Sequence, residues 1–129
     1  MKSLLPLLLS LALLSGTWVR PMIAASPPLT PVVATWFSNL HPRVGQRETV
    51  HVQFWAGKRY LSGARLSVTL RVGTKTVAHL RGTTTDKKGE AWARFTVPKA
   101  AAGKWLWAFT GVIYQKRTYT GNNRVLVAR

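Results

Sequence analysis

The sequence contains no cysteine. A disulfide is therefore excluded, and so is a lipoprotein anchor, which needs a lipid-modified cysteine behind its signal. The chain has 129 residues, enough for one domain. Without disulfides, that domain must be held together by its apolar interior, to which the five tryptophans after residue 25 can contribute.

Acidic residues are almost as scarce, and the chain has only Glu48, Asp86 and Glu90. Catalysis by paired carboxylates needs two acids across a cleft, whereas Asp86 and Glu90 fall in or beside one predicted turn. The histidines are spread along the chain, at His41, His51 and His79. They lack the spacing of metal ligands, no serine has a plausible histidine and acid as partners, and no glycine-rich phosphate loop is present. We therefore expect no enzyme, no metal and no cofactor.

The first 25 residues have the order of a cleaved secretory signal. Met1-Lys2 is a short positive region, residues 4–14 are almost wholly apolar, and small residues end in Ala24-Ala25. The apolar run is too short to span a bilayer comfortably. We expect cleavage after Ala25 and a protein that is secreted, periplasmic or associated with the cell surface, without a membrane span after cleavage. An uncleaved anchor or a core helix is the alternative.

Residues 26–31 are rich in proline and predict an extended lead-in to a domain of residues 32–129. Within that domain, short runs alternate between apolar and polar side chains, which is the pattern of a strand with one buried face. Strands are expected at residues 32–37, 49–55, 64–72, 76–80, 91–97, 105–114 and 118–127. Seven strands at short spacing, with no amphipathic helix, predict an all-β sandwich or barrel.

Two blocks carry a more specific signal. Residues 61–72 open on Leu-Ser-Gly-Ala and then alternate, and residues 84–98 read Thr-Thr-Asp-Lys-Lys-Gly-Glu-Ala before a second alternating run. This combination resembles bacterial immunoglobulin-like domains of the invasin/intimin type. The resemblance implies a seven-stranded immunoglobulin-like β-sandwich, a fold that hosts many unrelated functions. A carboxypeptidase-regulatory or transthyretin-like sandwich shares the Gly-Ala and Thr-Asp-x-x-Gly motifs and is the second possibility.

Several residues are expected to shape the fold. Gly63 and Gly89 each stand where a strand begins after a turn, and Asp86 is expected to bond backbone groups of its turn. A change of parity in the strand of residues 105–114 predicts a bulge at Gly111, and residues 121–123 predict a bulge or loop. Large apolar side chains favour the interior, so three tryptophans are expected in the core: Trp36, Trp105 and Trp107.

The charge balance is strongly basic. The chain has 19 lysines and arginines and a formal net charge of +16, which falls to +14 if Lys2 and Arg20 leave with the signal. The basic residues are scattered from Arg43 to Arg129, so they form a charged surface and not a tail. Such a surface predicts attraction to a polyanion (teichoic acid, lipopolysaccharide, an acidic glycan or nucleic acid) or to an acidic surface protein. A role in solubility alone is the alternative.

Tryptophans near basic residues are the candidate binding groups. Trp92 and Arg94 are predicted neighbours on an outer strand face, and Trp55 is predicted to face outward near Lys58 and Arg59. An exposed indole beside an arginine suits stacking on a sugar or base, while packing of Trp92 within the fold is the alternative. The sequence therefore predicts an exported, non-catalytic domain that binds an anionic envelope or extracellular polymer or an acidic surface protein. A structural surface subunit that assembles by edge-strand pairing is the alternative function.

Overall fold

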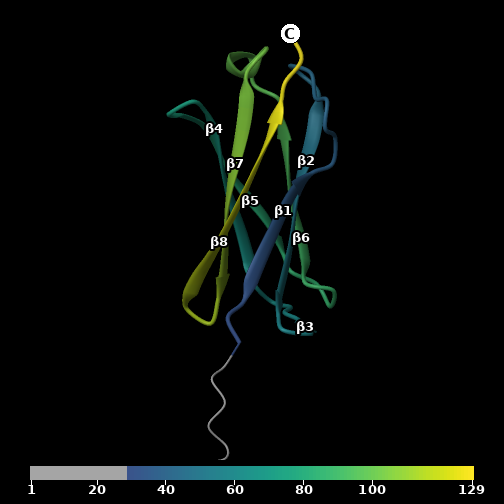
Figure 1. Ribbon diagram of the computed structural model, residues 1–129, viewed down its shortest axis with the longest axis vertical. Coiled ribbons are helices and arrows are strands. Elements are labelled where there is room, and N and C mark those ends of the chain that lie inside the picture. Colours follow the sequence, from purple (N-terminus) through teal and green to yellow (C-terminus); the bar gives the residue numbers. More distant parts are fainter. Residues whose placement is uncertain (1–28) are drawn as a thin grey trace, which may run out of the picture.

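A computed structural model describes residues 29–129 (Figure 1). The predicted signal and its cleavage point lie outside the described residues. The elements in chain order are β1 (Val32–Phe37), β2 (Arg47–Ala56), β3 (Arg59–Tyr60), β4 (Arg65–Val72), β5 (Lys75–Thr84), β6 (Glu90–Thr96), a short 3-10 helix η1 (Lys99–Ala101), β7 (Trp105–Tyr114) and β8 (Arg117–Leu126). Each of the seven expected strands is present, and the two-residue β3 makes eight.

The strands form two antiparallel sheets that face each other. In the first, the β2 sheet, β2 pairs with β1 on one side and with β3 and β6 on the other. The second, the β7 sheet, has the order β5-β4-β7-β8. Figure 1 shows β1 of the first sheet running beside β8 of the second, and the two strands are in contact. The architecture is therefore all-β and sandwich-like.

Alternate side chains of the two sheets fill the space between them. The apolar residues of the alternating runs in β2, β4 and β6 are buried: Val50, Val52 and Phe54; Leu66, Val68 and Leu70; and Ala91, Ala93 and Phe95. Val72, at the end of the β4 run, is half-buried. Phe54 is fully buried, and its ring meets Tyr119 of β8 at 5.4 Å between ring centres. Among the described residues, no buried side-chain oxygen or nitrogen lacks a hydrogen-bond partner. Burial and satisfied polar groups thus replace disulfides in this domain.

The core prediction for three tryptophans is wrong. β7 buries Leu106, Ala108, Thr110 and Val112, so Trp105 and Trp107 lie on the opposite, outer face of the β7 sheet. Trp36 is half-buried on the outer face of the β2 sheet, where it stacks on His51 with ring centres 5.4 Å apart. In β7 both parities are largely apolar, and the smaller side chains fit the narrow space between the sheets. Ring size alone is therefore a poor guide to the buried face of this strand.

The two predicted irregularities in β7 and β8 are also wrong. Gly111 pairs in regular register with Ser67 and Thr120, and residues 121–123 continue the ladder opposite residues 108–110. Gly121 is glycine for another reason, since a Cβ there would lie 2.8 Å from the hydroxyl oxygen of Thr35. The Asn123 side chain donates to the Thr35 carbonyl at 2.8 Å, so the missing side chain at Gly121 allows β1 to approach β8.

The register instead breaks in β5. Arg65 pairs with Thr84 and Ser67 pairs with Arg81, so a single residue of β4 lies opposite Gly82 and Thr83. This is a β-bulge, which bends the strand and re-aims its side chains. The Thr83 hydroxyl accepts a hydrogen bond from the backbone N–H of Trp92 at 3.0 Å and so links β5 to β6 of the other sheet.

The surroundings of Gly63 and Gly89 predict unequal costs of substitution. Both have positive φ, +84° and +71°, but a Cβ at Gly63 meets open space, whereas one at Gly89 collides with the carbonyl oxygen of Phe54. Gly63→Ala should cost about 1–2 kcal/mol for the left-handed backbone. Gly89→Ala should cost more, because the turn must also move. Urea unfolding of both variants measures this, and equal costs would contradict the close approach at Gly89.

Candidate functional site

The outer face of the β7 sheet carries a row of large apolar side chains. β7 presents Trp105, Trp107, Phe109 and Ile113 there, because these residues alternate with its buried positions. Trp105 is 43% exposed and Phe109 38% exposed. The rings of Trp107 and Phe109 are stacked, with centres 5.7 Å apart and an angle of 16° between their planes. The row is a continuous apolar strip along one strand.

Two arginines from the neighbouring strands lie over these rings. Trp107 is opposite Arg71 of β4 on one side and Arg124 of β8 on the other. The Cζ atom of Arg124 is 4.1 Å from the ring centre of Trp105 and 5.3 Å from that of Trp107, and Arg71 Cζ is 5.3 Å from that of Phe109. Each such contact contributes about 0.5–1 kcal/mol at an exposed site. The contacts hold the two cations in place without neutralising them.

Two further arginines extend the same face towards the other end of β4. Arg65 is opposite Ile113 of β7, and Arg81 of β5 is opposite the exposed Ser67. Six residues separate Arg65 from Arg71 along β4, which corresponds to about 20 Å of extended strand. We refer to this surface as the arginine–aromatic face, made up of Arg65, Arg71, Arg81, Arg124, Trp105, Trp107 and Phe109.

No acid lies among these residues. Glu48 and Glu90 lie on strands of the β2 sheet, and Asp86 lies in the turn between β5 and β6. Glu48 accepts a hydrogen bond from the Asn39 side chain at 3.2 Å. Positive charge on the arginine–aromatic face is therefore not balanced within that face, and an anion from outside would meet four guanidinium groups.

The candidates from the sequence lie on the other sheet and in two separate places. Trp92, 39% exposed, and Arg94 face outward on β6, where Trp92 is opposite His51. Trp55 is half-buried on the outer face of β2. His51 and Trp55 are four residues apart on one strand, so about 14 Å separates the two tryptophan positions along the sheet. The structure does not bring Trp55 and Trp92 together.

The basic pair near Trp55 lies at the β2–β3 hairpin. Lys58 is in the turn, Arg59 begins β3, and both are exposed. Trp55 is opposite Tyr60 in the ladder. A shallow hollow of about 260 Å³ is lined there by Gln53, Trp55, Gly57, Lys58 and Tyr60. One basic side chain, Lys58, lines this hollow, whereas the arginine–aromatic face carries four arginines.

The Asp86 carboxylate is engaged by its own turn. Its Oδ1 accepts hydrogen bonds from the backbone N–H groups of Glu90 at 3.0 Å and Lys88 at 2.8 Å. These two donors hold the pKa of Asp86 below its ordinary value of 3.8, and the Glu90 N–H has the larger effect. A carboxylate satisfied in this way closes the turn and is poorly placed for acid–base chemistry.

Two further features are absent from residues 29–129. No group of three histidine, aspartate or glutamate residues there could hold a metal ion. The same part of the chain has no helix with the length and apolar character needed to cross a membrane.

Comparison with known proteins gives a likeness of fold alone. No protein-family model matches the chain, and no curated protein matches its sequence. The domain is similar in structure to Spo0M, a sporulation control protein from Bacillus subtilis, with a TM-score of 0.49 and 18% sequence identity. The match covers 77% of this chain and 49% of Spo0M, so this chain spans about half the length of that protein. A likeness of this degree carries no argument about family or function.

The Asp86 turn predicts a specific pH dependence of stability. A lowered pKa in the folded state means that Asp86 stabilises the fold above the pKa of the unfolded chain, and that this contribution is lost as pH falls through the folded value. Asp86→Ala should therefore lower the melting temperature at pH 7, and its difference from the wild type should shrink as pH falls below about 4. Asp86→Asn, which keeps an acceptor oxygen, is the control and should lose less at pH 7. A difference between Asp86→Ala and the wild type that stays constant from neutral to acidic pH would contradict this role.

Proposed function

We propose that this protein is an exported, non-catalytic binding domain of the immunoglobulin-like, invasin/intimin type, and that the arginine–aromatic face binds an anionic polymer of the cell envelope or the extracellular space. One observation carries the proposal: two arginines lie over exposed aromatic rings on a face that holds four arginines and no acid. The signal-like order of the first 25 residues supports export.

The arrangement of cations over rings suits a polymer with repeated negative groups. An arginine placed over an indole is held in position and still has N–H groups to donate to phosphate, sulfate or carboxylate oxygens. Because the cations are already positioned, less side-chain entropy is lost on binding. The rings between them offer apolar surface to the sugar or base units of the same polymer.

The strand order supports the immunoglobulin-like assignment. Constant-type immunoglobulin sandwiches place strands A, B, E and D in one sheet and C, F and G in the other, and variable-type domains add strand C′ beside C. Here β1, β2 and β6 take the first three places, and β4, β7 and β8 take the other three, with β5 beside β4. The Thr-Asp-x-x-Gly motif then lies in the turn that leads into β6, the strand equivalent to E.

Edge-strand pairing is less favoured, because neighbouring strands lie along the edges of both sheets. β1 lies beside β8, and the Thr35 carbonyl accepts from the Asn123 side chain. At the other side, β5 lies beside β6, and the Trp92 N–H donates to Thr83. Each contact occupies one backbone group of an edge strand and places another strand beside that edge, which leaves less room for a further chain.

Binding to a soluble polyanion should depend steeply on salt and on this face. For a phosphate polymer, the log–log slope of affinity against salt should be about −0.7 to −0.9 per phosphate engaged. Arg71→Gln with Arg124→Gln should reduce the size of that slope by about two, one unit per arginine. Trp107→Ala should cost about 1–3 kcal/mol of binding free energy, the range for loss of a stacked ring. Fluorescence anisotropy with a labelled polyphosphate or single-stranded oligonucleotide measures both effects.

Matched controls lie on the other sheet. Arg47→Gln with Arg94→Gln removes the same charge from the β2 sheet, and Trp92→Ala removes one exposed indole there. Both should leave affinity nearly unchanged after correction for net charge. Equal losses from the two arginine pairs would leave the charge as a general solubility feature, and a loss confined to Trp92→Ala would transfer the site to the β2 sheet.

A further inference from the structure

The bulge in β5 opens a hollow beside the arginine–aromatic face. The hollow has a volume of about 410 Å³ and is lined by Arg65, Leu66, Ser67, Arg81, Gly82, Thr84 and Ile113. Gly82 packs closely on Leu66 in the wall of this hollow, because a Cβ at that position would lie 2.6 Å from a methyl carbon of Leu66. A space of this size can take one substituent of a polymer chain together with part of the unit that bears it.

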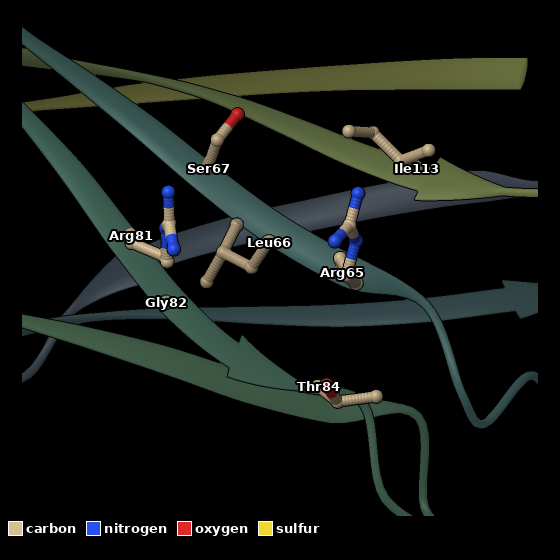
Figure 2. A pocket seen from close by; sticks show the side chains of 7 residues that line it. All are labelled: Arg65, Leu66, Ser67, Arg81, Gly82, Thr84 and Ile113. Carbon is tan, nitrogen blue, oxygen red and sulfur yellow. The ribbon is translucent and has the colours of Figure 1, made fainter.

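Two guanidinium groups from different strands flank this hollow. Figure 2 shows Arg65 of β4 and Arg81 of β5 extending to the same side of their strands, with the Ser67 hydroxyl on that side as well. The ladder neighbours of Arg65 are Thr84 and Ile113, and Ser67 lies opposite Arg81. Neither arginine therefore has an acidic ladder neighbour. The acid nearest to Arg81 along the chain, Asp86, is engaged by backbone N–H groups of its own turn.

We propose that Arg65, Arg81 and Ser67 form a subsite for a single tetrahedral oxyanion, a phosphate or sulfate group. Two guanidinium groups and a hydroxyl supply donors from three directions, which matches the three outward oxygens of a phosphate or sulfate monoester. A carboxylate has two oxygens in one plane, and one arginine in bidentate contact already satisfies them. The subsite rests on the proposed function in one respect, namely that the oxyanion is borne by the polymer that the arginine–aromatic face binds.

The first arm of the test uses small ions and the purified protein. Inorganic phosphate and sulfate, titrated at constant ionic strength, should shift the NMR signals of the Arg65 and Arg81 side-chain Nε–H groups and of the Ser67 amide in a saturable way. Acetate should bind more weakly. The double variant Arg65→Gln, Arg81→Gln should weaken phosphate binding by about tenfold or more, as expected for loss of charge-assisted hydrogen bonds. The control pair Arg47→Gln, Arg94→Gln should leave it within about twofold. Thermal melting checks that both variants fold.

The second arm uses three polymers that carry different classes of anion: a phosphorylated glycan, a sulfated glycan and polyglutamate. The Arg65/Arg81 variant should lose affinity for the first two by about tenfold more than the control pair does, and should match the control pair on polyglutamate. A variant that behaves like the control pair in both arms overturns the subsite. Small-ion binding that shifts backbone amides over the whole surface, without saturation at Arg65 and Arg81, overturns it as well.

The two arms separate this inference from the function proposed above. If polymers bind through Arg71 and Arg124 but not through Arg65 and Arg81, the subsite is wrong while the binding function stands. If small oxyanions saturate at Arg65 and Arg81 but no polymer binds, the subsite stands and the polymer function falls.

Discussion

The position of β7 inside its sheet is the constraint on which the proposed binding surface depends. β7 is hydrogen-bonded to β4 on one side and to β8 on the other. Because side chains alternate between the two faces of a sheet, the orientation of one residue of β7 determines the orientation of the others and of their partners on β4 and β8. Leu106, Ala108 and Val112 face the interior and are fully buried. Trp105, Trp107 and Phe109 must then share the outer face with Arg71 and Arg124. A shift of β7 by one residue would turn its aromatic rings inward and remove them from beneath Arg71 and Arg124.

The concentration of cations on this face has an energetic cost that the fold offsets elsewhere. Like charges on neighbouring strands repel one another, and no acid lies between them. Two features limit the effect: the guanidinium groups rest on electron-rich rings, and the domain is held by a core of alternate apolar side chains from both sheets. A surface that keeps an unbalanced charge despite this cost is one that an anionic partner can stabilise further.

Alternation and turn residues were sufficient to predict the all-β class, the seven longer strands and the buried sets of β2, β4 and β6. The facing of β7 could not be predicted in the same way, because Leu106, Ala108 and Val112 compete with larger rings of the opposite parity and only pairing with β4 and β8 decides between them. For the same reason the irregularities predicted at Gly111 and at residues 121–123 were wrong, whereas Gly63 and Gly89 have the positive φ expected of them. Gly121 packs against Thr35 of β1, which is distant in sequence, so the local pattern could not predict this contact. Gly82 in the β5 bulge packs against Leu66 of the neighbouring strand. The sequence around Arg71 and Arg124 does not indicate that these arginines lie over aromatic rings, because the rings belong to another strand.

The indole signals of the tryptophans test the central claim most directly. The described domain contains five, at Trp36, Trp55, Trp92, Trp105 and Trp107, and each side-chain N–H gives its own NMR resonance. When a soluble polyphosphate is added, the resonances of Trp105 and Trp107 should shift or broaden in proportion to the bound fraction, while those of Trp36, Trp55 and Trp92 stay in place. Shifts at Trp55 and Trp92, with Trp105 and Trp107 unmoved, would contradict a binding face on the β7 sheet.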